Sequence, residues 1–327
     1  MSSNFMRLTT ALLATATLSC TLPATGQSFP QKKIVSLVVP FAPGGGNDIL
    51  ARALAPKMSQ ALGQTIIIEN KPGAGGNIGA ELVARSAPDG YTFFIASSQV
   101  TMNPFLGMKI PFNIERDFEP IGLVASVPLV LVTNEHAPYK TFQEFQAYAK
   151  ANPGKISYSS PGNGTPQHLA GEVFAKMNKT QLLHIPYRGT GPSITDLLAG
   201  QIQASFATYA SVAPHIQSGK LRPLAIAGQK RSPLLPEMKT FGDYGMRSYD
   251  ASLWYSLLAP AKTPADIVEK INQALVAALN DPAVSKQLAE QGFESQSSSP
   301  TELKAFITKE LTRWERVIKE NQIKVAL

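Results

Sequence analysis

Residues 34–46 read Ile-Val-Ser-Leu-Val-Val-Pro-Phe-Ala-Pro-Gly-Gly-Gly, and this stretch decides how the rest of the chain is interpreted. Its first seven residues form an almost continuous apolar run with β-branched side chains, which predicts a strand buried on both faces of a sheet. The glycine-rich loop leads into Asn47 and Asp48, either of which can cap a helix. Apolar residues then recur four apart, at Leu50, Leu54, Met58 and Leu62. The stretch therefore predicts a strand, a tight loop and a helix in succession.

The same order of elements is repeated along the chain. Strands are expected at 65–69 and 91–96 with a short helix at 80–87, and this alternation predicts a mostly parallel α/β sheet. A second strand, glycine loop and helix series begins at Ile156. We therefore predict an α/β protein of two lobes with a ligand cleft between them.

The domain organisation is inferred from where the pattern restarts. Residues 1–26 are expected to form a signal peptide, 27–125 the first part of lobe 1, 126–249 lobe 2, and 250–327 a return to lobe 1. The last segment carries predicted helices at 282–291 and 300–321. We expect this tail to pack on the first lobe.

Two glycine loops, within residues 38–48 and 156–165, share one plan. Glycine lets the backbone approach a ligand, and the free N–H groups of the helix after the loop attract an anion without a charged side chain. One such loop is explained by the turn that any α/β protein needs. Because there are two, we favour a site in which each loop grips a carboxylate.

A third glycine-rich segment, residues 72–79, is similar to a dinucleotide-binding fingerprint after a strand. Its glycine spacing is loose, Lys71 and Pro72 intervene after the strand, and no acidic strand end occurs about twenty residues on. A structural turn is the favoured interpretation, and no cofactor is expected.

Composition narrows the class of protein. The chain of 327 residues is 44% apolar and 16% charged, with a formal charge of +7, which allows a large core. Lysine and arginine are scattered, whereas a nucleic-acid site would gather them into a stripe. We therefore expect no nucleic acid partner, and mild attraction of anions at most.

The N-terminus matches an export signal, with Arg7 as its only charge, an apolar stretch from 8 to 22, and small residues before Gln27. A periplasmic location is expected. The rival interpretation is a lipoprotein cleaved before Cys20, but Thr17 stands where a lipobox usually has leucine. Since Cys20 is the only cysteine, no disulfide, thiolate metal site or cysteine nucleophile is expected in the exported protein.

Catalytic motifs are missing from the sequence. There is no Gly-x-Ser-x-Gly elbow and no His-Glu-x-x-His, and the four histidines lie far apart along the chain. His136, His184 and His215 are interpreted as ordinary residues. His168, three residues after Thr165, is expected to orient the second loop rather than to touch the ligand. No catalytic residue and no metal site are predicted.

Several motifs together carry a family resemblance over nearly the whole exported chain. They are Val-Pro-Phe-Ala-Pro-Gly-Gly at 39–45 with Asp48, Glu-Asn-Lys-Pro-Gly-Ala-Gly-Gly-Asn-Ile-Gly at 69–79, Pro-Asp-Gly-Tyr-Thr at 88–92, Gly-Asn-Gly-Thr-Pro-Gln-His-Leu-Ala-Gly-Glu at 162–172, Pro-Tyr-Arg-Gly at 186–189, and Ala-Pro-Ala-Lys-Thr-Pro at 259–264. In order and spacing they resemble the Bug (TctC-like) family, the substrate-binding components of tripartite tricarboxylate transporters.

The resemblance implies a type II periplasmic-binding-protein fold that closes on a carboxylate. Carried over position by position, it implies these ligand-binding residues: Phe41, Pro43, Gly44, Gly45, Ser98, Ser160, Gly162, Gly164 and Thr165, with Tyr187 on the cleft wall. Asp48, His168 and Thr208 complete the predicted ligand-binding set. This sequence departs from the family pattern at Gln203-Ala204 and Ala207-Thr208, which removes an obvious anchor for an amino group. Trp254 and Tyr255 are read as core or hinge packing, with stacking on an aromatic ligand as the alternative.

Three functions remain open at this point. The leading one is capture of a di- or tricarboxylate, an amino acid or an aromatic acid for the membrane permease subunits of such a transporter, by a monomer. The second is a sensor that docks on a membrane receptor. The third is an exported hydrolase or lyase, which needs a nucleophile and a base within reach of one another.

Overall fold

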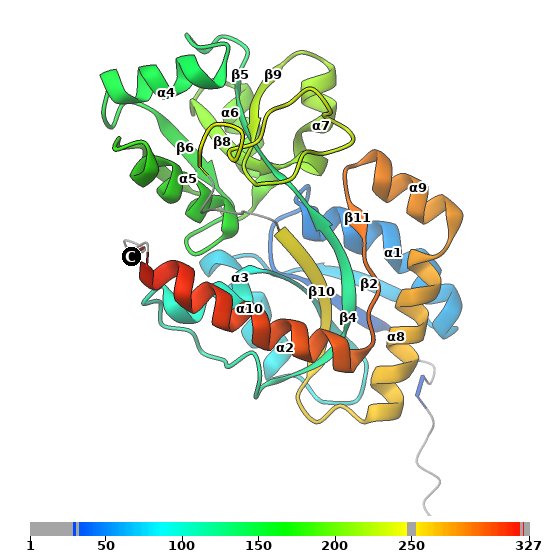
Figure 1. Cartoon of the computed structure of the whole chain (residues 1–327). Helices are drawn as coiled ribbons and strands as arrows, with labels where there is room; N and C mark the ends of the chain where they lie inside the picture. Colours follow the sequence, from blue (N-terminus) through cyan, green and yellow to red (C-terminus); the bar gives the residue numbers. More distant parts are fainter. Residues whose placement is uncertain (1–28, 31–32, 247–252, 321–322, 324–327) are drawn as a thin grey trace, which may run out of the picture.

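The computed structural model describes residues 29–30, 33–246, 253–320 and 323, and the expected signal segment with Cys20 and Gln27 lies outside the described residues. The described chain forms two sheets, each packed with helices, and they build the lower and upper lobes seen in Figure 1. The prediction of two α/β lobes is therefore confirmed. We call the lobe that contains β1 (Val35–Val39) the first lobe, and the lobe that contains β6 (Ser157–Ser160) the second lobe.

The first lobe is built on a six-stranded sheet with the strand order β11-β4-β10-β3-β1-β2. Its strands are β1 (Val35–Val39), β2 (Ile66–Asn70), β3 (Thr92–Ser97), β4 (Phe118–Val127), β10 (Leu253–Pro260) and β11 (Glu294–Ser295). Its helices are α1 (Gly46–Leu62), α2 (Asn77–Ala84), α3 (Gln99–Met102), α8 (Ala265–Leu279), α9 (Pro282–Glu290) and α10 (Pro300–Glu320), with 3-10 turns at Ala74–Gly76 and Asn103–Phe105.

This sheet is mixed, which corrects the expectation of a mostly parallel sheet. Strands β1, β2 and β3 are parallel as expected, but β10 lies antiparallel between β3 and β4. The first strands end at the edge that faces the second lobe, whereas β10 begins there, because the chain is returning from that lobe. An apolar run in the sequence carries no information about this direction.

The second lobe has a five-stranded sheet with the order β7-β6-β8-β5-β9. Its strands are β5 (Leu129–Asn134), β6 (Ser157–Ser160), β7 (Leu183–Pro186), β8 (Ala204–Thr208) and β9 (Leu221–Ile226), and its helices are α4 (Phe142–Ala151), α5 (Pro166–Met177), α6 (Thr190–Leu198) and α7 (Tyr209–Gln217). β6 is parallel to β7 and β8, and β5 is antiparallel to β8 and β9. Only Pro128 separates β4 of one lobe from β5 of the other.

Successive side chains along the strands of the first lobe point to opposite faces of its sheet. Leu37 and Phe93 pack with α1 and α8 on one side of the first sheet, while Val38 and Phe94 pack with α2 and the start of α10 on the other. Both faces are covered, which is why the strand from 35 to 39 is apolar at almost every position.

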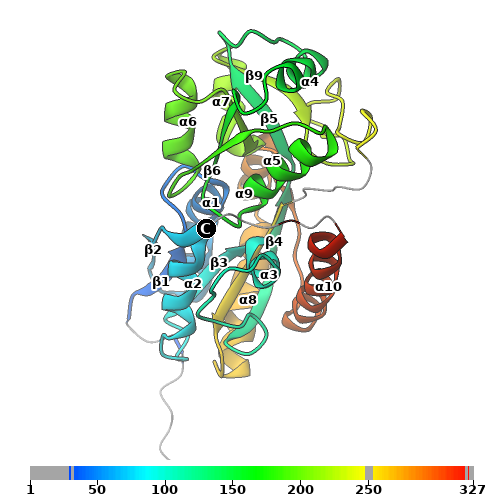
Figure 2. The ribbon, with the colours of Figure 1, turned by 90° about the vertical axis from the view of Figure 1, so that its left-hand side faces the viewer.

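Helix α10 contacts both lobes. Figure 2 shows it at the right of the molecule. Leu303 and Ile307 pack in the core of the first lobe, but Trp314, Ile318 and the nearby Ile323 pack in the main core of the second. The expectation that this tail packs on the first lobe was therefore only half right. An amphipathic pattern identifies the buried face of a helix but not its neighbours.

Candidate ligand-binding site

A small cavity lies between the lobes where the two glycine loops meet. The first lobe contributes its first loop and the ends of β3 and β10, and the second lobe contributes the starts of α5 and α6. The lining residues are Phe41, Gly45, Gly46, Asn47, Ser97, Pro161, Pro166, Gln167, Thr190, Leu253 and Tyr255. No Asp, Glu, Lys, Arg or His stands among these described lining residues.

Three helices begin at this cavity. Helix α1 starts at Gly46 after Gly45, α5 starts at Pro166 after Thr165, and α6 starts at Thr190 after Gly189. Gly45 and Gly189 offer no capping side chain. The first N–H groups of a helix lack partners within it and carry the positive end of its dipole, so three such termini make the cavity attractive to an anion.

The lobes touch each other around the cavity. The backbone N–H of Ala42 in the first loop donates to the carbonyl of Arg188 in the second lobe at 3.1 Å. Gly191 of α6 lies so close to Pro43 that a Cβ on it would stand 2.3 Å from the Pro43 carbonyl oxygen. Glycine is needed at this crossing because the two backbones pass without room for side chains.

Asp48 stabilises the first loop through hydrogen bonds. It is buried, and its carboxylate accepts hydrogen bonds from the N–H of Gly44 at 3.0 Å, from Arg52 at 3.0 Å and from Asn70 at 3.0 Å. Burial raises the pKa of Asp48, but the bonds from Arg52, Gly44 and Asn70 outweigh it and leave the pKa below its ordinary value. The carboxylate is therefore ionised, and it is already engaged in hydrogen bonds within the first lobe.

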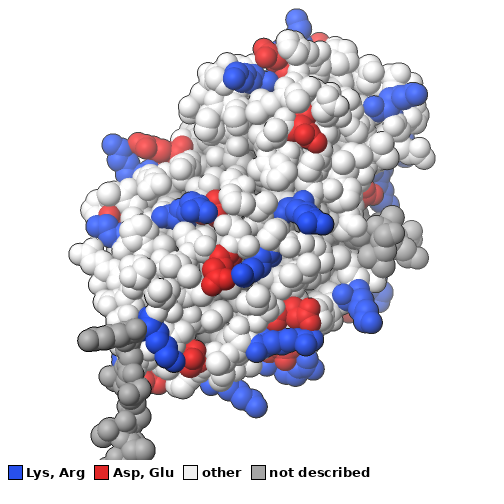
Figure 3. Space-filling model, turned by 180° about the vertical axis from the view of Figure 1, so that it is seen from behind, with Lys and Arg blue, Asp and Glu red and all other residues white. Residues whose placement is uncertain are grey.

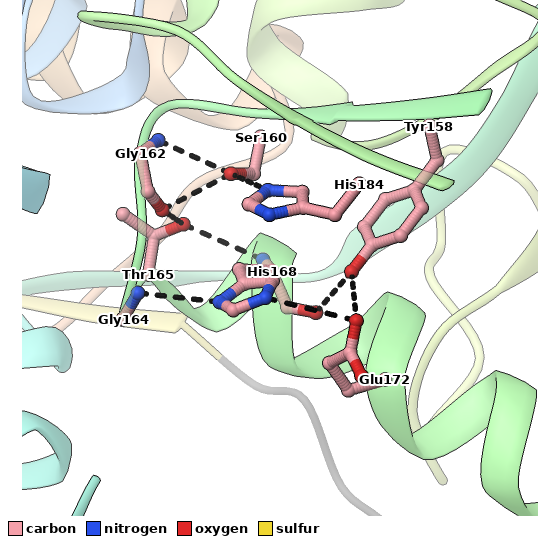
Figure 4. A network of polar contacts seen from close by, with 8 residues as sticks. All are labelled: Tyr158, Ser160, Gly162, Gly164, Thr165, His168, Glu172 and His184. Carbon is pink, nitrogen blue, oxygen red and sulfur yellow. Dashed lines mark hydrogen bonds and ion pairs between the residues drawn. The ribbon is translucent and has the colours of Figure 1, made fainter. Parts of the chain in front are cut away.

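The second loop is held by side chains beneath it, shown in Figure 4. Thr165 caps α5: its hydroxyl accepts from the N–H of His168 at 3.4 Å and donates to the Gly162 carbonyl at 2.7 Å. The Nδ1 of His168 accepts from the N–H of Gly164 at 3.3 Å. These contacts fix the backbone of Gly162 and Gly164, whose φ angles of +146° and +77° favour glycine.

His184, interpreted from the sequence as an ordinary residue, lies beside Ser160 and His168 of the second loop. Its ring stacks on His168 with centroids 3.9 Å apart, and its Nε2 lies 2.6 Å from the hydroxyl of Ser160. His184 reaches this position through the register of the sheet, in which the parallel neighbours β6 and β7 pair Tyr158 with His184. Burial lowers the pKa of His168 to about 4, and burial together with His168 lowers that of His184 to about 3. Both rings are uncharged at neutral pH.

Eleven of the thirteen predicted site residues fall into three groups. Phe41 and Gly45 line the cavity. Asp48, Ser160, Gly162, Gly164, Thr165 and His168 lie in or beneath the two loops and hold their backbone in place. Pro43 and Gly44 are exposed at the crossing with α6, and Ser98 is fully buried at the start of α3, next to Ser97, which lines the cavity.

Tyr187 and Thr208 are not among the residues that line the cavity. The hydroxyl of Tyr187 donates to Asp196 at 2.6 Å, and burial together with that carboxylate raises the pKa of Tyr187 to about 12. Thr208 is buried, and its hydroxyl lies 2.7 Å from that of Ser211. Both side chains have partners within their own lobe.

Most of the lining was not predicted to bind the ligand: Gly46, Asn47, Ser97, Pro161, Pro166, Gln167, Thr190 and Leu253. Gln167 and Thr190 come one or two positions after a glycine loop or its cap, so the helix-start signal was present and the side chains were overlooked. Tyr255 also lines the cavity, whereas Trp254 on the opposite face of β10 packs against Phe306 of α10 with centroids 5.2 Å apart. The two neighbours thus have different environments.

Three further features of the described chain are its surface charge, its possible metal ligands and the hydropathy of its helices. On the face shown in Figure 3, lysine and arginine alternate with aspartate and glutamate and form no stripe. Within the described ranges, no group of three or more His, Cys, Asp or Glu is placed to hold a metal ion. No helix in the part of the chain that is described is long and apolar enough to cross a membrane.

Known proteins share both the sequence and the fold. The family model described as "Tripartite tricarboxylate transporter family receptor" (TctC) matches residues 50–323. Protein BugT of Bordetella pertussis is 35% identical over 312 residues, which is 95% of each chain. The structure of periplasmic binding protein BugD is 34% identical with a TM-score of 0.87, covering 90% of this chain and 99% of that one.

A third relative is solved with a ligand. The structure of MatC from Rhodopseudomonas palustris with bound malate is 31% identical with a TM-score of 0.84, covering 89% of this chain and 100% of that one. The resemblance found in the sequence is thereby confirmed, and so is the periplasmic-binding-protein fold. The chain belongs to the TctC family of tripartite tricarboxylate transporter receptors, a family of periplasmic solute-binding proteins.

Proposed function

We propose that this protein captures a small organic carboxylate between its lobes and delivers it to the membrane permease subunits of a tripartite tricarboxylate transporter. The observation that carries the proposal is the convergence of the N-termini of α1, α5 and α6 on a cavity whose described lining has no charged side chain. Such a site binds an anion through backbone N–H groups and hydroxyls. MatC, which shares the fold, is solved with malate, a carboxylate of the size that we propose.

Capture requires that the lobes open and close. We propose that residues 27–125 and most of 250–327 move as one lobe against 126–249, that the crossing at Pro128 belongs to the hinge, and that the end of α10 with Trp314 and Ile318 stays packed on the second lobe. The contacts between Ala42 and Arg188, and between Gly191 and Pro43, are then those of the closed form. The ligand-binding residues that we propose are Phe41, Gly45, Ser97, Gln167, Thr190 and Tyr255 in contact, with the loop residues Gly44, Asp48, Ser160, Gly162, Gly164, Thr165 and His168 in support.

Hydrolysis is the second candidate, because the hydroxyl of Ser160 and the ring of His184 lie 2.6 Å apart. Two observations weigh against it. Ser160 is buried beneath the loop, with its oxygen bonded to Gly162, and is not among the lining residues. A base needs a pKa near the working pH, whereas that of His184 is lowered to about 3. We propose that the pair holds the loop and carries out no reaction.

The exported form is also part of the proposal. We propose that residues 1–26 are removed and that the protein is released into the periplasm, with a lipid on Cys20 as the alternative. Mass measurement of the N-terminal peptide separates the two. A start at Gln27 supports release, and a diacylglyceryl Cys20 overturns it.

A thermal-shift screen tests the function. Protein stripped of carried-over ligand is heated with mono-, di- and tricarboxylates, amino acids and aromatic acids. A ligand at about 100 times its dissociation constant adds about 2.7 kcal/mol of stability, which is a shift of several degrees. Folded protein that responds to no acid in the panel contradicts the proposal. Uptake of the best ligand by cells with and without the permease then separates transport from sensing.

A further inference from the structure

Three buried polar side chains line the cavity without a hydrogen-bond partner from the described protein. Gln167 is 5% exposed, Thr190 is 4% exposed and Tyr255 is fully buried, and their side chains make no hydrogen bond to another described residue. A polar group that lines a cavity and makes no bond within the protein can bond a ligand or a water molecule instead. Three such groups around one cavity are therefore available to a ligand.

The other polar side chains of the lining already have partners. The amide nitrogen of Asn47 donates to the carbonyl of Ile95 at 2.9 Å, and the hydroxyl of Ser97 donates to Gln99. The groups still available therefore come from three elements: α5 and α6 in the second lobe and β10 in the first. They surround the ligand rather than meeting it on one side.

The hydroxyl of Tyr255 fits its position only because Gly46, which faces it, has no side chain. A Cβ at Gly46 would lie 2.0 Å from the Tyr255 hydroxyl oxygen. Thr190 is placed in the same way against Gly45, where a Cβ would lie 3.2 Å from its Oγ1. The two glycines at the start of α1 thus leave room for hydroxyls from β10 and α6 beside the N–H groups of the helix.

A cationic group has no favourable place in this cavity. No carboxylate stands among the described lining residues, and Asp48 of the first loop is already paired with Arg52 and Asn70. The three helix N-termini place positive potential there. A buried ammonium without a counter-charge is strongly disfavoured.

Resting on the proposed function, we infer that the site selects carboxylates that carry a further oxygen function, such as a second carboxylate, a hydroxyl or a keto group, and no ammonium group. Gln167 and Tyr255 are specificity-determining residues that donate to this second oxygen function. Thr190 and the helix termini hold the first carboxylate.

Matched ligand pairs test the exclusion of ammonium. Isothermal titration calorimetry with the stripped exported protein compares succinate with aspartate, glutarate with glutamate, and 3-phenylpropionate with phenylalanine. In any pair that binds, the amino acid is expected to bind at least about 100-fold more weakly, because its ammonium is buried unpaired. An amino acid that binds as tightly as its partner overturns the inference and leaves carboxylate capture intact. Silence of all six together with silence of the whole thermal-shift panel overturns both.

Two substitutions test the residues, using the tightest-binding oxygen-bearing acid. Tyr255→Phe and Gln167→Met are each expected to weaken its binding by about 10- to 100-fold, as expected for a hydrogen bond to a charged or strongly polar group. Their thermal stability without ligand should be close to that of the unaltered protein, since neither side chain makes a hydrogen bond to another described residue. Tyr139→Phe is the matched control, because it removes the hydroxyl of a tyrosine that lies in the core of the second lobe, where the hydroxyl is buried without a partner. Unchanged affinity in both variants, with the control also unchanged, overturns their assignment.

Discussion

Gly75 in the first lobe faces Asn163 in the second so closely that a Cβ on Gly75 would stand 2.0 Å from the Asn163 carbonyl oxygen. A Cβ on the neighbouring Gly162 would in turn stand 3.0 Å from the Cα of Gly75. Two glycine segments from different lobes therefore pass backbone against backbone. The glycine-rich segment at 72–79, interpreted from the sequence as a turn, serves as a contact surface for the second glycine loop.

Gly75→Ala is expected to disfavour the closed form. The added methyl group meets the Asn163 carbonyl only when the lobes are together, and an overlap of this kind costs about 1–3 kcal/mol. Affinity for the best ligand should fall at least about tenfold, since about 1.4 kcal/mol corresponds to tenfold. Calorimetry measures the affinity, and small-angle scattering with saturating ligand should show a larger radius of gyration than the unaltered protein.

The matched control is Gly63→Ala. Gly63 has a φ of +66°, close to the +63° of Gly75, but no atom lies within 4 Å of its Cβ position. Both variants carry the same backbone strain, so both should lose some stability, while only Gly75→Ala should lose affinity. Equal affinities in the two variants would show that the contact plays no part in closure.

The sequence was sufficient to predict the strands and helices and the two glycine loops. The run at 35–39 and the spacing of Leu50, Leu54 and Met58 are local patterns, and the structure has the strand and helix where they predict them. The direction of β10 and the second-lobe contacts of Trp314 were not predictable in this way. They depend on the path of the chain between lobes, which leaves no periodic signal.

The site residues also divide into those that a local sequence pattern predicts and those that it does not. Gly45 and Phe41 were predicted because a glycine loop at a helix start is visible in the sequence, whereas Tyr255 reaches the cavity from a strand about 210 positions away along the chain. His184 and Ser160 meet only because β6 and β7 pair in register. Long-range pairing of this kind is what one sequence without relatives cannot supply.

Thr165→Ala is expected to lower both stability and affinity. Thr165 caps α5 and ties the Gly162 carbonyl, so alanine leaves the helix terminus and the loop without this support. The loss of such a cap costs about 1 kcal/mol of unfolding free energy, measured by urea titration. Thr165→Ser should retain most of it. Thr141→Ala removes the equivalent cap of α4, away from the cavity, and should lower stability without changing ligand affinity.

The histidine pair predicts a pH dependence of stability. In the unfolded chain histidine has a pKa of about 6.5, whereas His168 and His184 have values of about 4 and about 3 in the fold. Between pH 4 and 6.5 only the unfolded state takes up these protons, so unfolding free energy rises with pH in this window and is flat for this pair above it. His168 alone contributes at most about 3 kcal/mol.

The variant carrying both His168→Asn and His184→Gln should therefore have a shallower rise in unfolding free energy from pH 4 to 6.5, measured by urea titration at each pH. His136→Gln serves as the control because the side chain of His136 is 85% exposed. The slope of the control should match that of the unaltered protein. If the double variant also keeps that slope, the two rings are not buried uncharged.

Glu310→Ala is expected to be the most damaging change at the lobe junction. The carboxylate of Glu310 is 6% exposed and accepts from the indole nitrogen of Trp254 on β10 at 3.0 Å and from that of Trp314 at 3.2 Å. It also pairs with Arg313 at 3.1 Å. Alanine leaves two buried indole N–H groups without a partner. It also removes the link between β10, which lines the cavity through Tyr255, and the helix that contacts both lobes.

Unfolding free energy of Glu310→Ala should fall by about 3 kcal/mol. Glu315→Ala, on the exposed face of the same helix, should change it by less than about 0.5 kcal/mol. A loss no larger than that of the control would mean that the indole groups find other partners and that Glu310 does not hold the junction.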